Sequence, residues 1–102
     1  MNIKYRKVGT TLMLYVSGEL DECSAYGAKE ILDNIINNNT NSKKVVFDLS
    51  GLSFMDSTGI GLLIGRYKKL KQFNLPAYIT GASVSTEKVL EISGLYGIMP
   101  KY

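Results

Sequence analysis

The sequence predicts a single domain of mixed α/β class, in which helices pack against a mixed β-sheet. Apolar and polar side chains alternate around Ile3 and Tyr5, and again from Leu12 to Val16, as in an antiparallel hairpin. After this hairpin, helical and strand patterns take turns, giving the order strand, strand, helix, strand, helix, strand, helix, strand. The chain has 102 residues, of which 45% are hydrophobic, so residues 1–102 can bury a core as one domain.

The first helix is predicted from Ser24, a good N-cap residue, to the asparagine-rich loop at 37–42. We expect the two hairpin strands before it to lie at an edge of the sheet. The apolar side chains on one face of the helix recur at helical spacing: Ala28, Leu32, Ile35 and Ile36, with Ile31 beside them.

The remaining elements follow from shorter signals. Residues 43–49 form a nearly continuous apolar strand, of the kind that flanking helices bury on both faces. A helix at about 58–73 and a strand at 76–80 come next. The last helix starts near Ser83 and ends at Gly94, where a left-handed glycine followed by Leu95 fits a Schellman motif. The segment GIMP then predicts a short final strand.

The composition argues against most catalytic chemistry. A single cysteine, Cys23, cannot form an internal disulfide, and we expect no functional role for it. The absence of histidine removes the usual zinc ligand sets and the Ser-His-Asp and Cys-His catalytic groups. We therefore expect no catalytic residue, no metal, no cofactor and no enzyme activity.

The net charge of +3 indicates a solvated surface more than a nucleic-acid site. The first residues lack the apolar run of a signal peptide, and no stretch approaches the roughly 20 apolar residues of a membrane span. We expect a cytoplasmic protein that is a monomer when free and contacts neither membrane nor nucleic acid. The excess cations come from three clusters: Lys4, Arg6 and Lys7; Lys43 and Lys44; and Arg66, Lys68, Lys69 and Lys71.

The helix at about 58–73 carries two glycines outside its apolar stripe. Gly61 and Gly65 each weaken a helix by about 1 kcal/mol relative to alanine, so close approach by another surface should compensate. That surface can be the protein's own or a partner's. Two apolar residues outside the stripe, Leu62 and Phe73, have Arg66 and Lys69 between them and form a small mixed surface. The stripe that faces the sheet contains Ile60, Leu63, Ile64, Tyr67 and Leu70.

The start of this helix is crowded with polar residues. Asp56, Ser57 and Thr58 are all good helix-start residues, and one interpretation is that they only cap the helix. The other is that Ser57 presents its hydroxyl for phosphorylation. Free backbone N–H groups and the helix dipole would favour a phosphate there, while about two added negative charges beside Asp56 would act on a docking partner.

The glycines also permit a nucleotide-binding interpretation, which fits less well. Gly59, Gly61 and Gly65 give G-x-G-x-x-x-G, one residue longer than the dinucleotide fingerprint, with Ile64 where the third glycine belongs. The Walker lysine pattern is missing as well. A nucleotide-binding protein or enzyme remains the minor alternative.

Several stretches together resemble a known family. The segment DLSGLSFMDSTGIGLLIGRYK at 48–68, with GELD at 18–21, the following Ser24 and Ala25, and SGL at 93–95, resembles anti-sigma factor antagonists of the STAS domain class, above all those of sporulation. The resemblance implies the STAS fold, which usually continues into a further C-terminal helix that would be short or absent here.

The resemblance also implies a binding switch. The unphosphorylated form would bind an anti-sigma factor that is also a serine kinase and release a sporulation sigma factor, phosphorylation on Ser57 would switch it off, and a serine phosphatase would reset it. Thr58 would be the helix-start partner. A related stress-response or orphan regulator of another sigma factor is the alternative.

The same resemblance places Glu19 and Asp21 in a loop near this surface, where they would help to position the kinase. Ordinary solvated acids, with a helix-start role for Asp21, are the competing interpretation. The expected partner-binding residues are Glu19, Asp21, Asp56, Ser57, Thr58, Gly59, Gly61, Leu62, Gly65 and Arg66.

Overall fold

The computed structural model describes residues 1–102 and contains one mixed sheet. Strands β1 (Asn2–Val8) and β2 (Thr11–Leu20) form the predicted antiparallel hairpin. Strand β2 then pairs in parallel with β3 (Lys44–Asp48), and β3 pairs in parallel with β5 (Ala77–Thr80). A short strand, β4 (Leu52–Met55), pairs in parallel with the end of β2.

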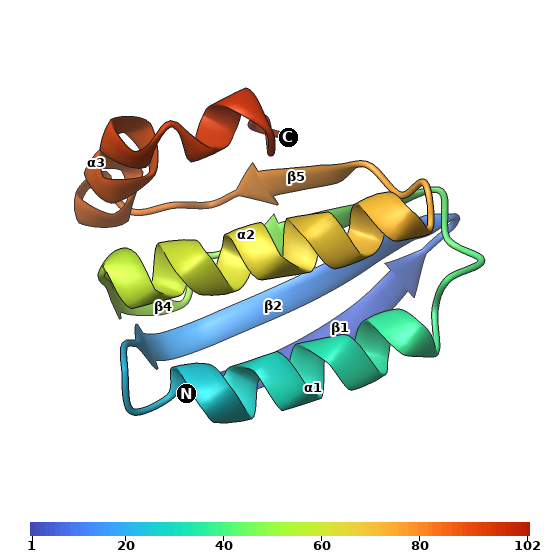
Figure 1. Cartoon of the computed structure of the whole chain (residues 1–102), viewed down its shortest axis with the longest axis horizontal. Coiled ribbons are helices and arrows are strands. Elements are labelled where there is room, and N and C mark those ends of the chain that lie inside the picture. Colours follow the sequence, from blue (N-terminus) through green and yellow to red (C-terminus); the bar gives the residue numbers. More distant parts are fainter.

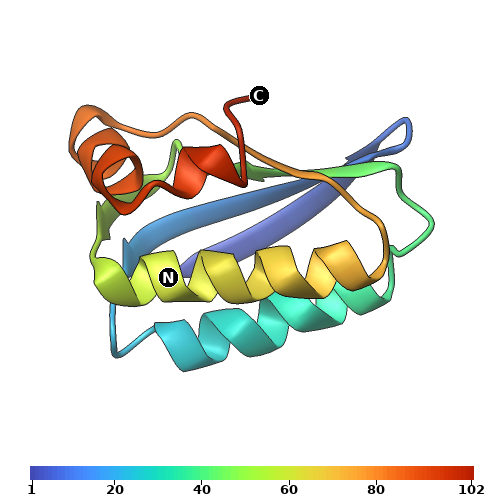
Figure 2. The same ribbon diagram turned by 45° about the horizontal axis from the view of Figure 1, so that its top comes forward.

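Three helices pack on this sheet, which confirms the predicted fold class. Helices α1 (Ala25–Asn37) and α2 (Ser57–Gln72) lie side by side on the same side of the strands (Figures 1 and 2). Helix α3 (Val84–Ser93) contacts β4 and leads into the short 3-10 helix η1 (Leu95–Gly97). None of the helices is long and apolar enough to cross a membrane.

The element order broadly follows the prediction, with three differences. Strand β4 was not predicted, because its buried residues Leu52 and Met55 are three apart and break the alternation of a strand. The GIMP segment is not a strand, since only an isolated bridge between Ile79 and Lys101 joins the chain end to β5. Strand β2 is central and not at an edge, because it pairs with β1, β3 and β4.

The core lies on the helix side of the sheet only. Alternate residues of the strands face α1, α2 and α3, and 22 buried apolar residues form one cluster there. Val46 is fully buried but stands outside this cluster, on the opposite face, where its register neighbours are Met13 and Tyr78. The prediction that helices bury β3 on both faces is therefore wrong.

The sequence signals hold at both ends of α3 but not for the cap at the start of α1. Ser83 caps α3 by accepting a hydrogen bond from the Thr86 N–H, and Gly94 ends it with φ of 76°, as predicted. Ser24 precedes α1 but its side chain makes no capping hydrogen bond; its hydroxyl donates to the Glu19 carbonyl instead. Ile31 of α1 is 45% exposed, so the apolar face is narrower than predicted.

An ion pair fixes the end of the chain to α3. The Lys101 ammonium pairs with the Glu87 carboxylate and lies 5.0 Å from the centre of the Tyr96 ring. The hydrogen bond from Lys101 lowers the pKa of Glu87, and the same bond raises the pKa of Lys101. Burial raises the pKa of Tyr96.

This ion pair predicts a modest pH dependence of stability. Because its folded pKa is depressed, Glu87 contributes stability above its ordinary pKa of 4.5, and the contribution is lost as pH falls through the folded value. Lys101, with a raised pKa, contributes fully below 10.5 and loses its contribution only above that pH. We expect Glu87→Gln to be less stable than the wild type at neutral pH and nearly equal to it in acid.

Urea unfolding at about pH 7 and about pH 3 measures the difference. Glu91→Gln is the matched control, because Glu91 is exposed on the same helix and forms no ion pair. Equal pH dependence of the two variants would contradict the prediction.

Candidate partner-binding site at the start of helix α2

The start of α2 leaves one hydroxyl exposed. Asp56 is the N-cap residue in extended conformation, and its carboxylate Oδ1 accepts a hydrogen bond of 2.9 Å from the Thr58 N–H. Ser57 is the first helical residue and is exposed, whereas Thr58 is half-buried. A carboxylate therefore caps the helix, and Thr58 takes part in the helix start through its N–H.

The electrostatics at Ser57 combine two opposing effects. The free N–H groups and the dipole at the N-terminus of this 16-residue helix favour a negative charge. The Asp56 carboxylate already occupies one of those N–H groups, so a phosphate on Ser57 would stand beside a resident negative charge. Such a phosphate would be tolerated by the fold and would strongly change the charge of the surface.

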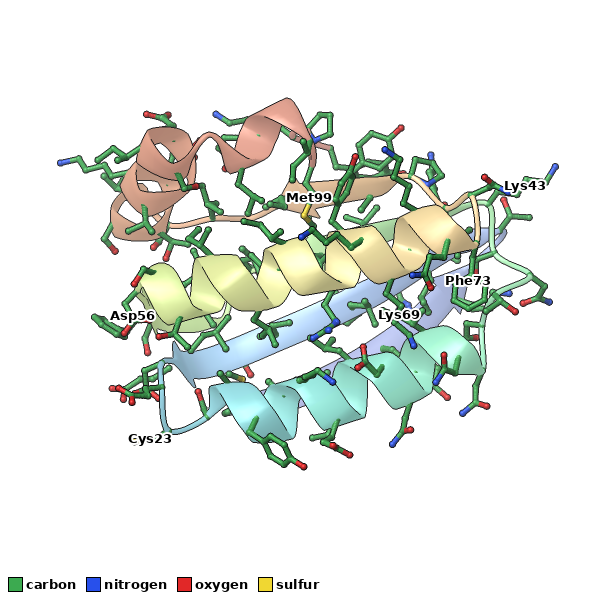
Figure 3. All side chains as sticks on the ribbon, viewed as in Figure 1. Cys23, Lys43, Asp56, Lys69, Phe73 and Met99 are labelled. Atoms are coloured by element: carbon green, nitrogen blue, oxygen red, sulfur yellow. The ribbon has the colours of Figure 1, made fainter.

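The two acids before α1 take different positions. Glu19 is exposed and lies on β2, opposite Phe54 of β4, and not in a loop as expected. The Asp21 carboxylate accepts hydrogen bonds from the N–H groups of Cys23 and Ser24, at 3.0 and 3.1 Å, so it orders the start of α1. Asp56 and Cys23 lie at the same end of the molecule, where α1 and α2 both begin (Figure 3).

The glycines of α2 fall into two kinds. Gly59 is buried, and a Cβ there would meet Met55 Cγ at 2.4 Å and Leu20 Cδ2 at 3.1 Å, so glycine permits close packing inside the protein. At Gly61 and Gly65 a Cβ would meet no atom within 4 Å. Packing inside the protein therefore explains Gly59. It does not compensate for the loss of helix stability at Gly61 and Gly65.

Two residues expected at the surface are inside. Leu62 is 8% exposed and belongs to the core, and Arg66 is 6% exposed. The Nε atom of Arg66 lies 2.8 Å from Oδ1 of Asp33 on α1. Phe73 is 41% exposed but lies near the other end of α2, away from Asp56 (Figure 3). The predicted mixed surface of Leu62, Arg66, Lys69 and Phe73 is therefore not formed.

A different set of residues continues from Ser57 along the helix. Gly61, Gly65 and Lys68 continue from it at intervals of four, four and three residues, so they follow one face of the helix, and this face is open to solvent at Gly61 and Lys68. Phe54, 47% exposed and three residues before Ser57, flanks the helix start. We refer to Glu19, Phe54, Ser57, Gly61, Gly65 and Lys68 as the partner face.

Phe54 and Lys68 were not among the expected partner-binding residues. The spacing from Ser57 to Lys68 was a usable signal for the lysine. No sequence signal indicated Phe54, because strand β4, on which it lies exposed, was not predicted.

The comparisons with known proteins agree on one family. The STAS domain family matches residues 2–102. The anti-sigma F factor antagonist of Paenibacillus polymyxa is 33% identical over 91 residues, which cover 89% of this chain and 77% of that protein. The anti-sigma-B factor antagonist of Staphylococcus aureus (strain NCTC 8325 / PS 47) is 36% identical over 84 residues, which cover 82% of this chain and 76% of that protein.

Solved structures show the same fold. The anti-sigma factor antagonist SpoIIAA in its unphosphorylated form superposes with a TM-score of 0.77 at 25% identity, covering 99% of this chain and 88% of that one. The phosphorylated form of the Bacillus protein SpoIIAA superposes with a TM-score of 0.69 at 25% identity, covering 99% of this chain and 91% of that one.

Proposed function

The chain belongs to the STAS domain family, and we propose that it acts as an anti-sigma factor antagonist that docks on its target through the partner face. In this proposal the target is an anti-sigma factor that is also a serine kinase. Docking releases a sporulation sigma factor, phosphorylation of Ser57 ends the interaction, and a serine phosphatase restores it. The protein is then a regulator and not an enzyme, and a regulator of sigma factors would act in the cytoplasm.

The observation that carries this proposal is the exposed Ser57 beside a helix cap that does not need it. Because Asp56 supplies the capping group, the Ser57 hydroxyl can be modified without loss of the cap. The relatives support the same reasoning, since two are antagonists of anti-sigma factors and SpoIIAA has a phosphorylated form.

A mass measurement tests the phosphorylation. The purified protein is incubated with Mg-ATP and the anti-sigma kinase encoded nearest to it, and its intact mass and modified peptides are determined. We expect one added phosphate, on Ser57, and none in Ser57→Ala. A phosphate on Thr58, or no phosphate while the kinase modifies a control substrate, would count against Ser57 as the acceptor.

A related antagonist of another sigma factor is the second candidate. It is favoured by the 36% identity to an anti-sigma-B factor antagonist, which is at least as high as the identity to the anti-sigma F factor antagonist. Pull-down of the protein with each anti-sigma factor of the same genome separates the two. If only the anti-sigma-B type is captured, the proposed sporulation target would be wrong, whereas the proposed antagonist function would stand.

Gly61→Ala provides a second test of the partner face. An added methyl group meets no atom within 4 Å, so we expect it to stabilise the helix by about 1 kcal/mol. If a partner approaches this face closely, the same methyl group weakens binding several-fold. Urea unfolding and calorimetric titration with the anti-sigma factor measure both effects.

Gly27→Ala is the matched control for this variant. Gly27 is exposed on α1, and a Cβ there also meets no atom within 4 Å. Equal affinity of the Gly61 and Gly27 variants would argue against close approach at Gly61.

A further inference from the structure

The sheet has a second face that carries no helix. The apolar residues packed on the core come from the helix side of the strands, and Met13, Tyr15 and Tyr78 are not among them. Both α1 and α2 lie on the other side in the two ribbon views (Figures 1 and 2). The helix-free face is therefore a sheet surface without a partner element.

Tyrosines and cations lie together on this face. Lys4 stands opposite Tyr15, and Arg6 stands opposite Met13, which is followed across the sheet by Val46 and Tyr78. We refer to Lys4, Arg6, Tyr15, Lys44, Tyr78 and Tyr102 as the tyrosine face.

At one edge of this face the aromatic groups meet. The rings of Tyr78 and Tyr102 have their centres 5.6 Å apart, and Lys44 Nζ lies 4.9 Å from the centre of the Tyr102 ring. Tyr15 and Tyr78 are half-buried, while Tyr102 is 57% exposed. The rings of Tyr78 and Tyr102 are thus partly fixed by each other and by Lys44.

The charge of this face is positive, because its three cations outnumber its acids and form no ion pair. The ion pairs of the structure use Lys29, Arg66 and Lys101, and none of the three cations of the tyrosine face. Two acids share the face: Asp48, which accepts hydrogen bonds from the Ser50 N–H and hydroxyl, and Glu19, which follows Tyr15 on β2 and alternates with the buried Leu20. A second copy of the chain would bring the same cations together, so an anionic partner fits better.

We propose that the tyrosine face binds single-stranded nucleic acid. Aromatic rings on an open sheet stack unpaired bases, and flanking lysines and arginines contact the phosphates, as in sheet-based RNA-binding domains. The six residues supply both kinds of contact on one surface. An acidic polypeptide would use the cations but would leave the three rings without a role.

This site departs from the sequence-based expectation of no nucleic-acid contact. Lys4 and Arg6 belong to one basic cluster of the sequence and Lys44 to another, and only the strand pairing brings them to one face. The tyrosine face lies on the side of the sheet opposite α2 and Ser57. Ser57 is not part of this face, so the proposal does not rest on the proposed function, and Ser57→Asp should leave the binding unchanged.

Fluorescence anisotropy with an end-labelled oligouridine of about 12 nucleotides tests the site. For three phosphate contacts the logarithm of the affinity should fall with the logarithm of salt concentration with a slope of about −2. Tyr15→Leu and Tyr102→Leu should each weaken binding about fivefold or more, because each removes a stacking ring. Lys4→Gln should make the slope less negative by about 0.7.

The controls remove the same groups from the helix side. Tyr26→Leu and Lys88→Gln replace an exposed tyrosine on α1 and an exposed lysine on α3, and both should retain wild-type affinity. Circular dichroism verifies the fold of each variant, and Tyr102→Leu is informative even if Tyr15→Leu unfolds, because Tyr102 is exposed at the chain end.

Three results would overturn the proposal. The first is no binding at low salt, and the second is an equal loss of affinity in the control variants. The third is unchanged affinity of the tyrosine variants, because binding would then reflect general charge attraction alone. Competition by poly-glutamate as effective as that by unlabelled oligouridine would assign the face to an acidic polypeptide instead.

Discussion

Asp33→Ala is expected to lower the free energy of unfolding by about 3 kcal/mol. The change would leave the Arg66 guanidinium, 6% exposed between α1 and α2, without its counter-ion. Arg66 Nε and Asp33 Oδ1 are 2.8 Å apart, so the two opposite charges attract each other strongly. An uncompensated buried charge costs more than the pair itself contributes.

Lys29→Ala is the matched control for this prediction. Lys29 also pairs with Asp33, at 3.3 Å, but its side chain is 52% exposed, so its loss should cost less than about 1 kcal/mol. The double variant Asp33→Leu with Arg66→Met should recover much of the lost stability, because it removes both charges together. Urea unfolding measures all three. If Asp33→Ala lowered the free energy of unfolding as little as Lys29→Ala, the Arg66 guanidinium would have to be solvated in the variant, which would contradict the prediction.

The buried Arg66 shows where sequence reasoning about the fold stops. Periodicity predicted the stripe of α2 that faces the sheet, and Leu63 and Leu70 are indeed buried. It could not show that α1 lies against the neighbouring flank, which buries Leu62 and gives an arginine an acidic partner. A charged residue is exposed by default, so only the position of Asp33 on another helix reveals the exception.

The candidate site was predictable to a similar extent. Three polar residues before an amphipathic helix indicate its start, and the structure places Ser57 there in an exposed position. The choice of capping group was not predictable, because Asp56, Ser57 and Thr58 are all suited to it. Phe54 became visible only through β4, which exists because the end of β2 offers it a parallel partner.

Ser57→Asp is expected to weaken binding to the anti-sigma factor by about 10- to 100-fold, a prediction that rests on the proposed function. The new carboxylate would stand next to Asp56 and be desolvated in the interface. The isolated domain should change in the opposite direction. An acid in the first turn of a helix stabilises it by about 0.3–1 kcal/mol, so the variant should unfold at equal or slightly higher urea concentration.

Ser57→Ala and Ser57→Asn should bind within about threefold of the wild type, because neither adds charge. Ser85→Asp is the matched charge control, since Ser85 is exposed in the first turn of α3 and lies outside the partner face. Calorimetric titration gives the affinities. Weaker binding by Ser57→Asn as well as Ser57→Asp would point to a steric or hydrogen-bonding role of the hydroxyl, and weaker binding by Ser85→Asp would extend the interface to α3. Equal affinity of the wild type and Ser57→Asp would remove the physical basis for a phosphorylation switch at this position, because a charge that leaves the interface unaffected cannot release the partner.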